Sequence, residues 1–235
     1  MSAGNRWRAA AVVILVAGVA GVSSLRADCG MGASAAKPVS GAAAASSAAV
    51  VPASAGGLAL GSTAPGRDVK MKSVDEKEYS IASVAGEKGT LVIFTCNHCP
   101  WAKAWQTRIA ELGNADQGRG IGVIAINAND PAAAAEDAFP EMVARAKEVG
   151  FKFPYVVDSG STVARAFGAE RTPEAFLFDS AGKLVYHGTI DDNAQDAGQV
   201  KQRYLADALD AVAGGKPVGM AETKALGCSI KFYGS

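Results

Sequence analysis

Two cysteines two residues apart follow directly on an apolar run, and this arrangement constrains the fold more than any other part of the chain. The run Thr90–Phe94 is typical of a buried strand, and residues 101–112 after the cysteines have helical spacing of apolar side chains. Cys96 would then lie at a helix N-terminus, where unpaired N–H groups and the helix dipole favour a thiolate. Cys99 follows about one turn later, close enough to form a disulfide with Cys96. A strand, a Cys-x-x-Cys and a helix in this order predict a redox-active dithiol.

Two other roles for this cysteine pair are open. The pair could supply half of a zinc site, but the sequence has no second Cys-x-x-Cys and no His-x-x-x-His to complete it. It could also form a permanent structural disulfide, although closing so short a loop removes little chain entropy. Redox chemistry is therefore the leading hypothesis.

The N-terminal segment has the composition of an export signal. Arg6 and Arg8 precede an apolar run at residues 9–22, which is the usual order in a secretory signal. The run is short for a membrane-spanning helix, although an uncleaved signal-anchor is open. Cys29 adds a third option, a lipoprotein, but Arg26 stands where a lipobox usually has Leu.

Composition divides the chain into three segments. We expect a signal peptide or signal-anchor at 1–27, an Ala/Ser/Gly-rich linker at 28–57, and a folded domain with a C-terminal tail at 58–235. The 23 basic and 23 acidic side chains balance, which gives no reason to expect nucleic acid as a partner. Export suits the cysteines, because disulfide chemistry is expected outside the cytosol. We therefore expect a periplasmic protein, or one tethered to the membrane through its N-terminus and facing the periplasm.

The folded part has the pattern of an α/β domain. Apart from 90–94, strands are expected at 121–126, 155–157, 175–178 and 184–187, and helices at 101–112, 131–150, 161–167 and 199–213. Pro140 is expected to start the second helix late or to kink it. The apolar runs require burial on both faces, which predicts a central mixed sheet flanked by helices. The linker composition predicts a disordered N-terminal extension.

Three stretches resemble the thioredoxin superfamily, and more narrowly its redoxin branch of peroxiredoxin-like (AhpC/TSA-type) and exported thiol-disulfide proteins. They are residues 95–101 (Thr-Cys-Asn-His-Cys-Pro-Trp), 167–179 and 182–192, and the tail at 226–231 is similar to the end of the peroxiredoxin-like group. The resemblance covers about residues 58–213 and implies a thioredoxin-like fold.

The resemblance also implies roles for particular residues. Cys96 would be the nucleophile, the more exposed thiol with the lowered pKa, and Cys99 the resolving thiol. An imidazolium at His98 would further stabilise the Cys96 thiolate, unless His98 simply faces solvent. Thr172 would offer its backbone to an incoming peptide, and the bond to Pro173 would be cis.

Four further residues have open roles. Trp101 would be an aromatic contact for a partner, or a core residue. Cys228 would be a relay thiol for the cysteine pair, a partner for Cys29, or an inert buried thiol. His187 is a remote candidate for a metal ligand. No carboxylate can be placed beneath the resolving thiol from the sequence.

These observations predict an exported thiol-disulfide oxidoreductase acting on protein thiols and disulfides, with an unidentified redox partner and with no cofactor or bound metal. A peroxiredoxin-like thiol peroxidase with an antioxidant role is the first alternative. Peroxiredoxins surround their reactive Cys with Pro-x-x-x-Thr-x-x-Cys and a distant Arg. This sequence lacks the pattern around Cys96, and Arg171 is the candidate for the Arg. A thioredoxin-like metal-binding module is the second alternative.

Overall fold

The computed structural model describes residues 57–235 of the chain. The expected signal segment, Cys29 and all but the last residue of the expected linker lie outside the described residues. The strands are β1 (Met71–Ser73), β2 (Glu78–Tyr79), β3 (Gly89–Phe94), β4 (Ile121–Asn127), β5 (Tyr155–Val157), β6 (Arg171–Thr172), β7 (Glu174–Asp179), β8 (Leu184–Gly188) and β9 (Cys228–Ser229). The α-helices are α1 (Pro100–Gln117), α2 (Phe139–Val149), α3 (Thr162–Phe167) and α4 (Tyr204–Ala213), and the 3-10 helices are η1 (Ala82–Val84), η2 (Ala135–Asp137) and η3 (Ala197–Gln199).

Seven strands form a mixed sheet in the order β2-β1-β5-β4-β3-β7-β8. The central strands β5, β4 and β3 are parallel. β7 runs antiparallel beside β3, β8 runs antiparallel beside β7, and β1 runs antiparallel beside β5. Strands β6 and β9 form a separate two-stranded sheet. The predicted α/β architecture, a central mixed sheet flanked by helices, is confirmed.

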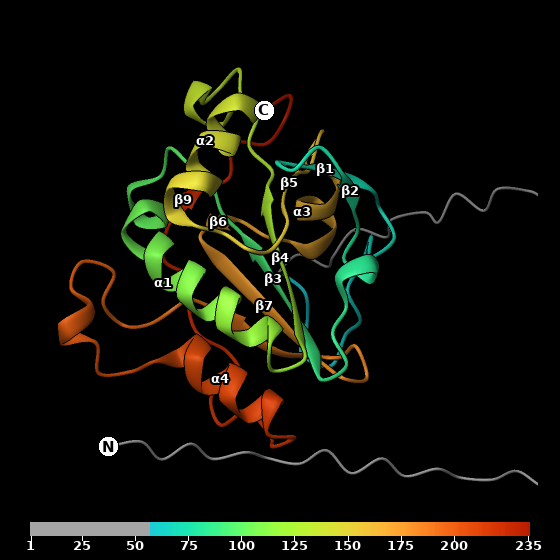
Figure 1. Ribbon diagram of the computed structural model, residues 1–235, viewed down its shortest axis with the longest axis vertical. Helices are drawn as coiled ribbons and strands as arrows, with labels where there is room; N and C mark the ends of the chain where they lie inside the picture. The colour runs from blue at the N-terminus through green and yellow to red at the C-terminus, as the bar shows by residue number, and fades with distance from the viewer. Residues whose placement is uncertain (1–56) are drawn as a thin grey trace, which may run out of the picture. The chain divides into compact units, whose positions relative to one another are not determined.

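Helices cover both faces of the central sheet, with α1, α2 and α4 on one face and α3 on the other (Figure 1). Successive side chains of a strand point to opposite faces, and β3 feeds both cores in this way. Leu91 and Ile93 pack under α1, α2 and α4. Val92 and Phe94 pack under α3. Because β3 is buried on both faces, its carboxyl end is a rigid platform for the residues that follow it.

Two helices start later than the sequence predicts. The helix expected from residue 131 begins at Phe139 with Pro140 in its first turn, because Ala138 before it is extended. The segment before it forms η2, which ends at Asp137. The helix expected from residue 199 begins at Tyr204, and residues 197–199 form η3, where Asp196 accepts a hydrogen bond from the Gly198 amide. Within residues 57–235, none of the helices is long and apolar enough to cross a membrane.

Candidate active site

The two cysteines of the Cys-x-x-Cys lie between the carboxyl end of β3 and the start of α1. Cys99 is the N-cap residue of α1, and Pro100 occupies the first turn, where a missing N–H costs nothing. Cys96 is 6% exposed and Cys99 is 0% exposed, so Cys96 is the more accessible sulfur, as predicted. Both are free thiols in the structure.

Thr172 contacts both sulfurs. The Cys96 thiol lies 3.2 Å from Oγ1 of Thr172, and the Cys99 thiol donates to the Thr172 carbonyl oxygen at 3.1 Å. The bond between Thr172 and Pro173 is cis, as predicted. The structure therefore brings Cys96 and Cys99 together with Thr172 and Pro173, although the two cysteines are more than 70 positions from Thr172 in the sequence.

A buried carboxylate holds the loop that carries Thr172. Glu174 Oε2 accepts the backbone N–H groups of Glu170 and Arg171, each at 2.8 Å. Its Oε1 lies 2.6 Å from Nε2 of His187, whose ring stacks on Phe176. His187, a remote candidate for a metal ligand, thus binds Glu174 of the neighbouring strand.

A second buried carboxylate, Asp137, organises the segment between the cysteines. Its Oδ1 accepts the Asn97 amide N–H at 2.6 Å, and its Oδ2 lies 2.6 Å from Nδ1 of His98 and 2.8 Å from Nδ2 of Asn129. Asp137 and His98 each place a polar atom within 4.8 Å of Cys96 Sγ. His98 is therefore fixed between its cysteine neighbours by a carboxylate, and the solvent-facing alternative is wrong.

The surroundings of Cys96 include groups that raise its pKa, against the direction that the sequence predicts. The hydrogen bond with Cys99, burial of the sulfur and the negative charge of Asp137 raise the pKa of the Cys96 thiol, and the Thr172 hydroxyl only partly offsets them. Cys96 was expected to gain from the N-terminus of the following helix, but α1 begins at Pro100, and Cys99 is the residue at its N-terminus.

Cys228 joins this pair as a third thiol. It lies on β9 opposite Thr172 and packs against Cys96, Cys99 and Ala102. Hydrogen bonds from Cys96 and then from Cys228 lower the pKa of Cys99. Burial, followed by the hydrogen bond to Cys99, raises the pKa of Cys228 to about 11. The three thiols therefore titrate as one coupled group.

The tail also occupies the backbone edge that was expected to receive a peptide. Thr172 pairs with Cys228 and Arg171 pairs with Ser229 in an antiparallel ladder. Trp101 is 40% exposed with its ring 5.8 Å from that of Trp105, so its role as a core residue is excluded.

Asp137, Glu174 and Asn129 are site residues that the sequence analysis did not assign. A signal for Asn129 exists, because Asn127-Ala128-Asn129-Asp130 follows β4, and the carboxyl ends of the parallel strands β3 and β4 meet at one edge of the sheet. Asp137 lies eight residues further on in a 3-10 turn, where spacing gives no such signal.

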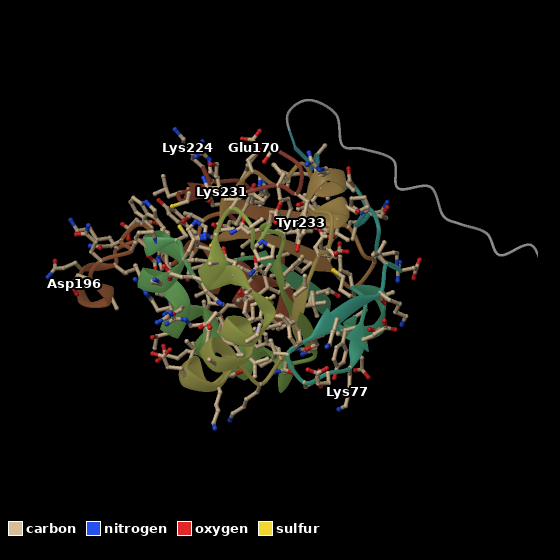
Figure 2. The ribbon with its side chains drawn as sticks, turned by 90° about the horizontal axis from the view of Figure 1, so that it is seen from above. Lys77, Glu170, Asp196, Lys224, Lys231 and Tyr233 are labelled. Carbon is tan, nitrogen blue, oxygen red and sulfur yellow. The ribbon has the colours of Figure 1, made fainter. Side chains whose placement is uncertain are left out.

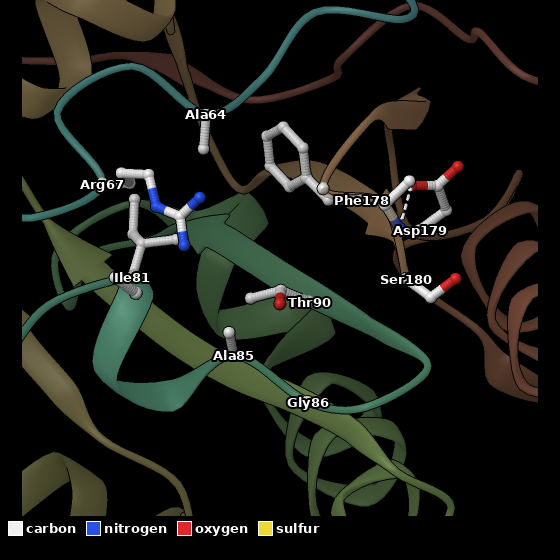
Figure 3. A pocket seen from close by; sticks show the side chains of 12 residues that line it. Ala64, Arg67, Ile81, Ala85, Gly86, Thr90, Phe178, Asp179 and Ser180 are labelled. Carbon is white, nitrogen blue, oxygen red and sulfur yellow. Dashed lines mark hydrogen bonds between the residues drawn. The ribbon is translucent and has the colours of Figure 1, made fainter.

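A cavity of about 180 Å³ lies elsewhere on β3 (Figure 3). Figure 3 shows the Arg67 guanidinium directed toward the space between Ile81, Thr90 and Phe178. Thr90 is near the start of β3, whereas Cys96 follows its end. The lining includes no cysteine, so this cavity is separate from the thiol site.

Curated relatives of this chain are bacterial thiol-disulfide proteins. The thiol-disulfide oxidoreductase ResA of Geobacillus thermodenitrificans is 28% identical over 135 residues, which cover 57% of this chain and 72% of the relative. The ResA protein of Halalkalibacterium halodurans is 30% identical over 98 residues, covering 42% and 52%.

Solved structures extend the similarity to most of the domain. A hypothetical protein from Sinorhizobium meliloti is 34% identical with a TM-score of 0.70, covering 76% of this chain and 97% of its own. An uncharacterised conserved protein from Geobacillus kaustophilus is 35% identical with a TM-score of 0.70, covering 75% and 94%. A thioredoxin-like protein solved in its oxidised form has a TM-score of 0.53 at 21% identity, covering 68% and 99%, which supports the fold.

The Redoxin family model matches residues 59–202, which include β3, the cysteine pair, the Thr172–Pro173 loop and η3. The match spans more than half of the chain and agrees with the resemblance in the three sequence stretches. The chain therefore belongs to the Redoxin family and has a thioredoxin-like fold.

Proposed function

We propose that this protein is an exported thiol-disulfide oxidoreductase that uses Cys96 and Cys99 as a dithiol/disulfide couple on protein substrates. The observation that carries the proposal is that both sulfurs, which follow the carboxyl end of the buried strand β3, contact Thr172. The family match and three curated relatives named thiol-disulfide oxidoreductase support this class.

Cys96 is the nucleophile in this proposal, because Cys99 is 0% exposed and no partner disulfide can reach it. Its sulfur bonds to one sulfur of the partner disulfide, and the other partner sulfur leaves as a thiolate. The raised pKa of Cys96 means that a proton must first be removed. His98, whose Nδ1 lies against Asp137, is the candidate acceptor.

Cys99 then resolves the mixed disulfide. Its sulfur attacks Cys96 Sγ, the bond between Cys96 and the partner breaks, and the second partner sulfur leaves. Cys99 attacks as a thiolate, and the hydrogen bond from Cys228, which lowers the pKa of Cys99, is still available once Cys96 is bonded to the partner. The exposed ring of Trp101 is the proposed contact for the partner chain, whereas Thr172 and Pro173 are buried and Thr172 already pairs with Cys228 of the tail.

The geometry favours disulfide exchange over peroxide reduction. Arg171, the candidate Arg for a peroxidase, directs its guanidinium to the carbonyl oxygen of Gly227 in the tail at 3.4 Å. Arg171 also influences the pKa of Cys228. Its described contacts thus point to the tail, and the peroxidase alternative gains no support from them.

The test is a trapping experiment with Cys99→Ser. Without its resolving thiol, Cys96 should hold a partner protein as a mixed disulfide that dithiothreitol releases. The Cys96→Ser/Cys99→Ser variant is the matched control and should trap nothing through this site. A Cys99→Ser variant that traps no protein disulfide, while reduced wild type reacts rapidly with hydrogen peroxide, would support the peroxidase instead.

Export is the second part of the proposal. It rests on Arg6, Arg8 and the apolar run that follows them. Fractionation of cells that express the full chain should place it in the periplasm or in the membrane fraction facing the periplasm. Recovery in the cytoplasmic fraction alone would contradict export and leave the thiol chemistry untouched.

A further inference from the structure

The C-terminal tail is built into the thiol site. Cys228 pairs with Thr172, the residue that contacts both Cys96 and Cys99. A Cβ atom added to Gly227 would lie 2.2 Å from the Thr172 carbonyl oxygen, so this approach of the two backbones requires glycine. The tail is therefore fitted to the site at backbone level.

Contacts on the far side of Cys228 hold the tail in place. The Ile230 amide donates to the Glu170 carbonyl oxygen at 2.9 Å, and the Ile230 side chain is buried in the core. The Lys231 amide donates to Oδ1 of Asn129 at 2.7 Å, which links the tail to the Asp137 network. Figure 2 shows Glu170 and Lys231 at the same edge of the molecule. Cys228 thus has a fixed position beside the pair.

We infer that Cys228 is a third redox thiol of this site and exchanges a disulfide with Cys99. The inference rests on the proposed function and extends it. It stands on the packing of Cys228 against the cysteine pair and on its register opposite Thr172. The exposure of the three thiols suggests why such an exchange would be useful. Cys99 is 0% exposed and Cys96 is 6% exposed, whereas Cys228 is partly exposed and can be reached by a partner.

The exchange moves a disulfide without net oxidation. Starting from the Cys96–Cys99 disulfide, the Cys228 sulfur loses its proton and bonds to Cys99 Sγ. The bond between Cys99 and Cys96 breaks, and the electron pair leaves with Cys96, which takes up a proton. The product is a Cys99–Cys228 disulfide with an outer sulfur that a protein dithiol can attack. One partner thiolate bonds to Cys228 Sγ and Cys99 leaves as a thiolate that takes up a proton. The second partner thiol then displaces Cys228, so both cysteines end as thiols and the partner dithiol becomes a disulfide. The positive charges of Lys231 and Arg171 partly offset the burial and the contact with Cys99 that raise the pKa of Cys228.

The test uses Cys96→Ser, which leaves Cys99 and Cys228 as the thiols of the site. Trypsin places Cys99 on peptide 89–103 and Cys228 on peptide 225–231, so a bond between them joins two peptides. In the glutathione buffer that oxidises the wild-type pair, we expect this linked peptide to exceed glutathione-capped Cys99 by about tenfold or more, because the two thiols are held together. Cys96→Ser/Cys228→Ser is the matched control and should carry glutathione or a free thiol on Cys99. A Cys29→Ser background removes the fourth cysteine.

The opposite result overturns the inference. Cys99 and Cys228 that remain separately alkylated in Cys96→Ser, while the wild type forms its Cys96–Cys99 disulfide, would show that Cys228 is inert and leave the proposed function standing. A wild type with no Cys96–Cys99 disulfide in the same buffer would instead remove the proposed function. If circular dichroism shows that Cys96→Ser does not fold, Cys96→Ala replaces it. In addition, brief diamide oxidation of the wild type must yield the linked Cys99–Cys228 peptide beside the Cys96–Cys99 disulfide.

Discussion

A single buried carboxylate orders the segment beside the nucleophilic cysteine and adds to the raised pKa of its thiol. Asp137 orders the Asn97–His98 segment through its hydrogen bonds and, at the same time, raises the pKa of Cys96 by its charge. Asp137 thus has two opposite effects on the reactivity of Cys96. Its hydrogen bonds position the segment beside the thiol, whereas its negative charge disfavours the thiolate.

Asp137→Asn should make Cys96 more acidic. Removing the negative charge lowers the pKa of Cys96, so its rate of alkylation by iodoacetamide should begin to rise at a pH lower by roughly one unit. Mass spectrometry of the Cys96 peptide across a pH series measures this. Glu136→Gln is the matched control, because Glu136 loses the same charge one residue away but pairs with Lys103 at the surface. An unchanged profile in Asp137→Asn would show that the carboxylate does not control Cys96.

At the scale of the elements, the site depends on β6 being held in register by β7 and β9. Glu174 of β7 fixes the amides of Glu170 and Arg171 from one side, and the ladder to Cys228 fixes Thr172 from the other. The short β6 therefore gains its order from long-range contacts, which explains why no strand is predicted at these two residues from the sequence.

Glu174→Gln should destabilise the fold by about 1–3 kcal/mol, because a buried carboxylate that accepts two backbone amides and faces His187 is replaced by a group with fewer acceptors. Urea denaturation followed by fluorescence measures the loss. Glu170→Gln changes an exposed carboxylate in the same loop and should stay close to wild type. Equal stability of the two variants would refute the role of Glu174.

Gly227→Ala should loosen β9 from β6, because its Cβ atom would meet the Thr172 carbonyl oxygen at 2.2 Å. We expect the alkylation rate of Cys228 to rise by about tenfold, the equivalent of about 1.4 kcal/mol. Gly219→Ala, whose Cβ atom meets open space, is the control and should leave the rate unchanged. A Cys228 that reacts no faster in Gly227→Ala would argue against the tight pairing.

For the whole molecule, the sequence was informative where local patterns decide the structure. Apolar runs placed β3, β4 and β7, and the Cys-x-x-Cys, with the Thr172-Pro173 motif, located the centre of the site. It failed where charge and burial act over long sequence distances. Asp137 reaches Cys96 only through the fold, and the hydrogen bond between the two thiols, together with burial of Cys96, acts on their pKa values against the expected order.

The pairing of the tail with β6 was equally beyond the sequence. Cys228 meets Thr172 across more than 50 intervening residues, and a two-residue strand has no periodicity of its own. The sequence left three roles open for Cys228, and its position beside the cysteine pair is seen only in the structure.

The most direct measurement is a redox titration of the full chain in dithiothreitol buffers, read from peptide 89–103 after alkylation. If Cys96 and Cys99 are a dithiol/disulfide couple, both thiols of this peptide should become resistant to alkylation together, in a single two-electron transition. A peptide that keeps two alkylatable thiols at every buffer ratio would contradict the proposed chemistry.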